Sequence, residues 1–236
     1  MATKEKTGSK RVITSINVKD PSDIVLKIST RMPISRSEPD DYVSHVKVSI
    51  CRYDGSTDED TEIGEAICLY VDNDLANNQG ISEFAMMDAH SDELLDVHSA
   101  LFDPETGFCK HAILERTPDI IGRSVFYIES IYLLPEYRGF GWGLLSLLGI
   151  IDEVGKGAAL VVLPSLPIRF QDEELNQRLS LPPLTEAEER QAIARLIDYF
   201  AAIGFDPVPG SDNLLYLSTA YCHPSVSDLL EKMKQG

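Results

Sequence analysis

Runs of apolar side chains divide the chain into predicted strands and helices. Residues 43–50 alternate apolar and polar side chains at period two, which is typical of a strand with one buried face. Residues 158–163 are apolar without a break, as expected of a parallel strand buried on both faces. The predicted strands are 24–28, 43–50, 66–71, 125–134, 158–163 and 213–218, and the predicted helices are 82–101, 144–154 and 185–203. We therefore predict an α/β fold in which the strand–helix–strand unit at 125–163 crosses over right-handed.

The last predicted helix has clear boundaries. Thr185 and Glu188 have the spacing of a capping box, and Gly204 is suited to end the helix. Its predicted buried stripe is Ile193, Leu196, Ile197, Phe200 and Ile203. The acidic residues between 54 and 65 are predicted to occupy the loop of a long hairpin between strands 43–50 and 66–71.

Three glycines lie where the strand 125–134 turns into the helix 144–154. The turn reads Tyr137-Arg138-Gly139-Phe140-Gly141-Trp142-Gly143. Glycine leaves the backbone N–H groups of such a turn uncovered, and the helix dipole adds partial positive charge there. Arg138 adds a full positive charge in a planar fork that suits phosphate. The turn therefore predicts a site for a phosphorylated ligand.

Net charge changes the list of partners. The chain carries 38 acidic against 21 basic residues, a formal charge of −17. This balance argues against a nucleic-acid partner, because such surfaces need basic patches that release counterions. It is compatible with a cationic amine substrate, or with a charge that only keeps the protein soluble.

The remaining composition indicates a cytoplasmic protein without a metal or a membrane partner. Cys51, Cys68, Cys109 and Cys222 have no metal-ligand spacing and are expected to be free thiols in a reducing compartment. Residues 1–10 lack the apolar core of a secretory signal and are predicted to be a disordered tail. We expect 11–236 to form a single domain, with 164–184 as an insertion that holds four prolines.

The glycine turn also resembles a known motif. The order Arg-x-x-Gly-x-Gly at Arg138, Gly141 and Gly143, with Leu133 and Pro135 before it, is similar to the pyrophosphate-binding motif of the GNAT superfamily. The resemblance covers about 127–163 and resumes at 196–205, where a helix ends in Gly-Phe. It implies the GNAT fold, a central mixed twisted sheet of about six to seven strands flanked by helices. It also implies acetyl-CoA as cosubstrate and transfer of its acetyl group to a primary amine of a small molecule or peptide, by direct attack in a ternary complex.

The resemblance assigns the acetyl-CoA contacts to the strand end and the turn. The backbone of Ile131, Leu133 and Leu134 would pair with the pantetheine amides, and an N–H near Leu133 would face the thioester carbonyl. The pyrophosphate would rest on the N–H groups of Arg138, Gly139, Phe140, Gly141, Trp142, Gly143 and Leu144.

Two catalytic residues are predicted with it. Glu129 is the candidate general base, because some polyamine acetyltransferases of the superfamily have a glutamate at this offset from the motif. The alternative is a strand glutamate that contacts solvent or an arginine. The family's usual tyrosine proton donor falls at Phe200, so Tyr199 after a local shift, Tyr132, Ser165 or solvent would protonate the thiolate.

Other departures leave the acceptor side open. The asparagine that often follows the fifth strand is replaced by Pro164-Ser165, and the segment between the first two strands is too short for the usual helices. We expect 82–101 to take over the substrate wall and 164–184 to form part of it or a lid. Alternatives are a catalytically inactive CoA-binding module and an α/β interaction protein with acidic loops. A homodimer is possible under each.

Overall fold

A computed structural model describes residues 23–167, 184–220 and 223–235. The tail predicted at 1–10 lies outside these residues, and so does the insertion predicted at 164–184 except for its two ends. Among the described residues, no helix is long and apolar enough to cross a membrane.

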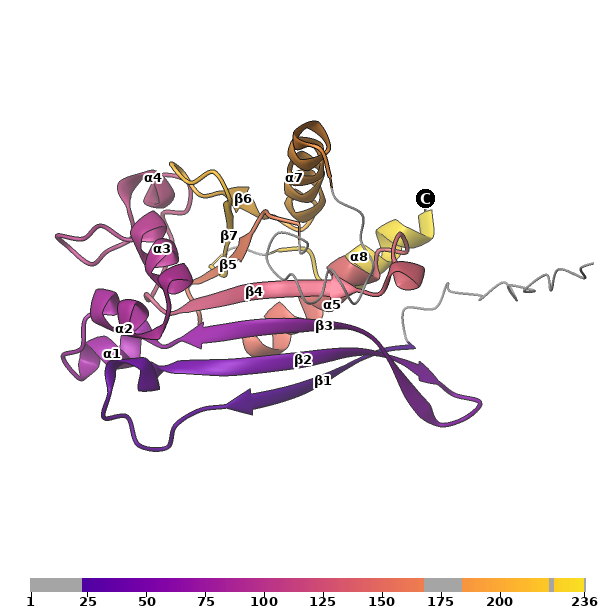
Figure 1. Cartoon of the computed structure of the whole chain (residues 1–236), viewed down its shortest axis with the longest axis horizontal. Coiled ribbons are helices and arrows are strands. Elements are labelled where there is room, and N and C mark those ends of the chain that lie inside the picture. The colour runs from indigo at the N-terminus through magenta and orange to yellow at the C-terminus, as the bar shows by residue number, and fades with distance from the viewer. Residues whose placement is uncertain (1–22, 168–183, 221–222, 236) are drawn as a thin grey trace, which may run out of the picture.

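Seven strands form one open mixed sheet in the order β1-β2-β3-β4-β5-β7-β6 (Figure 1). The strands are β1 (Ile24–Arg31), β2 (Val43–Asp54), β3 (Glu59–Val71), β4 (Val125–Leu133), β5 (Leu160–Pro164), β6 (Asp206–Pro207) and β7 (Leu214–Ser218). Neighbouring strands are antiparallel except β4 and β5, which are parallel. The predicted α/β class and strand number are confirmed.

Helices cover both faces of the sheet. The helices are α1 (Asn73–Asn78), α2 (Glu83–His90), α3 (Asp92–Leu101), α4 (His111–Leu114), α5 (Trp142–Val154), α7 (Glu186–Ala201) and α8 (Val226–Gln235). One core contains α5, α8 and the Phe126 and Ile128 side chains of β4. The other contains α1 to α3 and the Val125 and Tyr127 side chains of β4. Figure 1 shows α1 to α4 gathered at one end of the sheet and α7 standing above β4 and β5.

A β-bulge interrupts β4 at Glu129. Ser130 pairs with Ile67 and Ile128 with Cys68, so Glu129 has no partner in the register between the two strands. The extra residue shifts the alternation of side chains. Phe126 and Ile128 face the α5 core before the bulge, and Ile131 and Leu133 face it afterwards. The bulge therefore leaves Glu129 out of the backbone pairing between β3 and β4.

The parallel join between β4 and β5 is short. Among the described residues, the two strands pair through Val125–Tyr127 and Leu160–Val162 alone. Beyond this point β5 continues beside β7, up to the pair of Pro164 and Leu214. The second half of β4 is therefore separated from β5 by a gap.

The structure corrects three sequence predictions about the elements. The helix predicted at 82–101 is two helices, because Ser91 adopts an extended conformation and its side chain accepts from the Leu94 N–H as an N-cap. The acidic hairpin is mostly strand rather than loop, since the turn spans only 55–58 and Asp60 pairs with Lys27 across strands. Pro164 ends β5 as its last residue instead of lying beyond it.

A further correction concerns α7. Its capping box is confirmed, with the Thr185 N–H and hydroxyl donating to Glu188. The predicted buried stripe is confirmed at Phe200 and at Ile203, just after the helix, and only in part along the rest of the helix. Of the α7 side chains, all of which the structure describes, Phe200 alone is buried, and Ile193, Leu196 and Ile197 are partly exposed. The second half of the helix attaches it to the body, because Leu196 and Ile197 pack against the same core as Phe200.

Candidate active site

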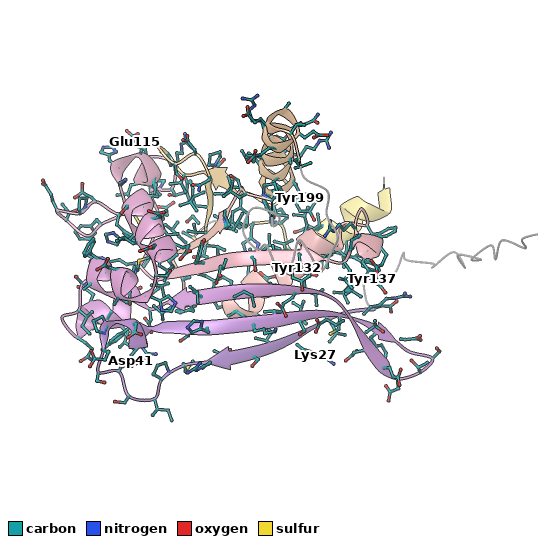
Figure 2. All side chains as sticks on the ribbon, viewed as in Figure 1. Lys27, Asp41, Glu115, Tyr132, Tyr137 and Tyr199 are labelled. Atoms are coloured by element: carbon teal, nitrogen blue, oxygen red, sulfur yellow. The ribbon has the colours of Figure 1, made fainter. Side chains whose placement is uncertain are left out.

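A cleft of about 780 Å³ lies in the gap between β4 and β5. Its walls are the second half of β4, the glycine turn with the first turn of α5, the end of β5, and one side of α7. Figure 2 shows Tyr199 at the foot of α7 and Tyr132 on β4. The predicted site residues that line the cleft are Glu129, Ile131, Leu133, Arg138, Gly139, Gly141, Trp142, Gly143 and Tyr199. Leu134, Phe140 and Leu144 are not among its described lining residues.

No described strand pairs with the second half of β4 on the cleft side, although the Leu133 carbonyl there accepts from Arg138. On the other side of β4, the Leu134 N–H donates to the Ile63 carbonyl at 2.8 Å. Backbone groups alternate sides along a strand, so the N–H groups of Leu133 and Ile131 point away from β3 and into the gap. An extended ligand that carries amide groups can pair with such an edge.

The glycine turn needs glycine for its backbone shape. Gly139 and Gly141 have φ values of 84° and 78°, in the left-handed region that side chains with a Cβ avoid. Gly141 is the N-cap of α5 and has no side chain that could cap the helix amides. The ring of Trp142 is buried and stacks on Tyr137 at 6.1 Å between centroids, which fixes the turn against the core. The first amides of α5 are therefore presented by a rigid turn.

Arg138 ties this turn to β4. Its Nε donates to the Leu133 carbonyl at 2.7 Å. The bond keeps the guanidinium beside the strand end while the side chain remains exposed and lines the cleft. A guanidinium in this place can meet an anion that rests on the α5 amides.

Glu129 opens into the cleft rather than into the core. Its side chain is exposed overall, but partial burial against the cleft wall raises the pKa of its carboxyl. The Glu93 carboxylate raises it further, and the imidazole of His45 acts in the opposite direction. A carboxylate with a raised pKa is a better proton acceptor near neutral pH than an ordinary one. Glu129 therefore lines a cavity instead of the hydrophobic core.

Tyr199 reaches the cleft in spite of its offset along the helix. A Cβ atom placed on Gly143 would lie 2.6 Å from the Tyr199 hydroxyl, so the phenol rests against the first turn of α5. Burial of the hydroxyl raises the Tyr199 pKa, although the ring as a whole is 38% exposed, and the Leu144 amide, directed at the oxygen, lowers it. Phe200 also lines the cleft from the same helix turn.

The other residues proposed for the site differ in whether they line the cleft. Tyr132 lines the cleft, whereas the Ser165 side chain is buried outside its described lining. No residue of 82–101 is among that lining, and these helices follow β3 at the opposite end of β4 from the glycine turn. Pro164, Leu166, Pro167 and Leu184, at the ends of the predicted insertion, do border the cleft.

Sequence reasoning missed the polar side of α7. Glu188, Gln191 and Arg195 line the cleft at the spacing of one helix face that continues to Tyr199. The spacing of these three polar residues could have indicated a helix face at a cleft, but the apolar residues on the neighbouring face suggested that the helix was buried. No cluster of described residues could hold a metal ion.

Comparison with known proteins does not identify a family for this chain. A scan against protein-family models finds none that matches the chain, and a search of curated proteins finds no match either. The function is therefore inferred from the geometry and chemistry of the cleft.

Proposed function

We propose that the protein is a GNAT-type acetyltransferase that transfers the acetyl group of acetyl-CoA to a primary amine. One observation carries the proposal: the half of β4 that no described strand pairs on the cleft side and the first amides of α5 line the same cleft. The pantetheine arm of CoA carries amides and its other end carries a diphosphate. The two features of the cleft match the two ends of this ligand in kind.

The proposed binding mode follows from this match. The pantetheine amides pair with the β4 edge at Ile131 and Leu133, and the diphosphate lies on the amides at the start of α5 beside Arg138. The acceptor amine then approaches from the side of Glu129. The diphosphate and the amine then occupy opposite ends of the cleft, so that each substrate binds in one orientation.

The proposed chemistry uses Glu129 as the general base. Its carboxylate takes a proton from the ammonium, directly or through water, and the neutral nitrogen attacks the thioester carbon. A backbone N–H near Leu133 stabilises the oxyanion of the tetrahedral intermediate. Collapse of the intermediate breaks the C–S bond, and the thiolate leaves and takes a proton. Among the cleft hydroxyls, Tyr132 is a candidate for that proton transfer, as is Tyr199, whose position also supports the role argued below.

The test has a binding arm and a turnover arm. Calorimetry is expected to show acetyl-CoA binding, and Gly141→Val should abolish it, since Val is strained at this φ and blocks approach to the amides. Gly210→Val is the matched control, because Gly210 has a similar φ of 82° and its added Cβ would meet nothing. Wild-type protein that does not bind acetyl-CoA would refute the proposal.

A second candidate is an inactive CoA-binding module. It is favoured by Phe200, which stands where the family's usual proton donor would be. The turnover arm decides between the two: thiol release from acetyl-CoA is followed with a panel of amines and peptides. Release with at least one acceptor supports the enzyme, and binding without release supports the module.

The setting of the proposed enzyme is the cytoplasm. Cys51, Cys68 and Cys109 are free and buried, as suits a reducing compartment. The proposal includes no metal, nucleic acid or membrane, and it is compatible with a monomer or a homodimer.

A further inference from the structure

Helix α7 forms a whole wall of the cleft with one face. Its described cleft-lining residues are Glu188, Gln191, Ala192, Arg195, Leu196, Tyr199 and Phe200. They recur at three- and four-residue intervals along a helix of 16 residues, so a continuous stripe faces the opening. Leu196 and Phe200 of this stripe pack against the core, whereas the side chains of Gln191 and Arg195 are exposed where the helix lines the cleft. Gln191 and Arg195 can therefore contact a ligand that enters the cleft.

The Tyr199 hydroxyl lies at the anion-binding end of the cleft. It rests against Gly143 at the start of α5, where the uncovered amides lie. A phenol both accepts and donates. An anionic oxygen that arrives there can take over the Leu144 amide and receive the O–H of Tyr199.

Arg195 lies one helix turn from Tyr199 on the same stripe. The charged side chains among the described lining residues are Arg138, Arg195, Glu129 and Glu188. The guanidinium groups of Arg138 and Arg195 can both meet an anion that enters the cleft. Glu188, two turns further from Tyr199, is engaged in the cap of α7 with Thr185.

We propose that Tyr199 and Arg195 bind the diphosphate of the acyl carrier from the α7 side, opposite the α5 amides and Arg138. This inference rests on the proposed function and changes the role of Tyr199. The residue becomes a ligand-binding group at the phosphorylated end, and the proton for the thiolate comes from another source. Helix α7 then closes the diphosphate between two helices.

The experiment compares three ligands by calorimetry: CoA, dephospho-CoA and pantetheine. Tyr199→Phe and Arg195→Gln are each expected to weaken CoA binding by about tenfold, since a hydrogen bond to a charged group is lost. Dephospho-CoA should show the same loss, because it keeps the diphosphate. Pantetheine affinity should be unchanged. Arg190→Gln is the matched control, as Arg190 is an exposed arginine of α7 outside the described lining.

Kinetics separate this role from proton donation. With saturating acetyl-CoA, Tyr199→Phe should keep kcat and its pH profile while the KM for acetyl-CoA rises. A fall in kcat with unchanged CoA affinity would overturn the inference in favour of a proton donor. A loss with CoA that disappears with dephospho-CoA would also overturn it, since the arginine would then contact the 3′-phosphate. Failure of wild-type protein to bind any of the three ligands would instead refute the proposed function itself.

Discussion

Glu129 shows how the surroundings of one residue raise the pKa of its side chain. The β-bulge removes it from the ladder and turns it into the cleft, and the wall behind it raises its pKa. The charge of Glu93 acts in the same direction. In the proposed mechanism, the acidic limb of the pH–rate profile reports the titration of this carboxyl.

Replacing Glu129 by Gln should slow turnover without weakening acetyl-CoA binding. Loss of a general base lowers the rate by about 10²- to 10⁴-fold. The comparison is kcat at saturating substrates, with calorimetric affinity for acetyl-CoA alongside. Glu136→Gln, an exposed glutamate outside the described cleft lining, is the control and should have no effect. A variant whose pH–rate profile matches wild type would exclude Glu129 as the base.

Replacing Glu93 by Gln tests the neighbour rather than the base. Glu93 raises the Glu129 pKa, so removing its charge makes loss of the Glu129 proton easier. The acidic limb of kcat/KM against pH should move to lower pH, and kcat on the plateau should stay nearly constant. A limb that stays in place, or moves to higher pH, would show that the two carboxyls are not coupled.

At the scale of elements, the bulged strand β4 and helix α7 shape the cleft. The position of β4 depends on its neighbour β3, in which Gly64 lies opposite Leu133 in the register. Its missing side chain allows the Tyr132 carbonyl and the Leu133 side chain to approach the β3 backbone. The close approach of β3 thus supports the segment of β4 that forms the cleft wall.

Gly64→Ala is expected to destabilise the fold by about 2 kcal/mol or more, because the added Cβ meets backbone that cannot turn away. Chemical denaturation measures the change in unfolding free energy. Gly55→Ala in the hairpin turn is the comparison, since its nearest neighbour is a side-chain atom of Tyr53 at 3.7 Å. Equal stability of the two variants would contradict the close approach.

Helix α7 should show its weak attachment in hydrogen exchange. With Phe200 as its one buried side chain, the first turns of α7 are expected to exchange faster than α5, in which most side chains are buried. Acetyl-CoA should slow exchange in α7 if the helix closes on the ligand. Mass spectrometry of peptic fragments resolves the two helices. Exchange in α7 as slow as in α5 without ligand would contradict this expectation.

Sequence patterns predicted the strands and helices better than their interruptions. The run Val125 to Ile128 is apolar on both faces, so the shift of alternation at Glu129 is hidden. The break at Ser91 depends on one cap, and the apolar faces of α2 and α3 continue across it in a helical pattern. The glycine turn was predictable, because positive φ values demand glycine. The α7 wall was not, since only the tertiary position of a helix decides which face meets a cavity.

For the whole molecule, the charge of −17 is the dominant long-range property. Self-repulsion at this charge disfavours the compact state, and salt screens it. The screening length falls from about 30 Å at 0.01 M salt to about 8 Å at 0.15 M. The charge also explains why local arginines are needed where an anionic ligand is to bind.

The melting temperature should therefore rise by a few degrees between 0.01 M and 0.15 M sodium chloride. Differential scanning calorimetry at constant pH measures the shift. A buffer with an equivalent concentration of a neutral osmolyte serves as control for effects other than screening. A melting temperature that falls with salt would show that attractive pairs such as Lys27–Asp60 outweigh the general repulsion.

The short join between β4 and β5 allows one continuous sheet to contain an opening. Four strands on one side and three on the other are linked by the pairs from Val125 to Tyr127 and Leu160 to Val162. Both hydrophobic cores contain side chains of β4 and of β5, so the two parts of the sheet are held together on either face of the join. The width of the cleft is then set by the packing at this join as much as by the side chains that line it.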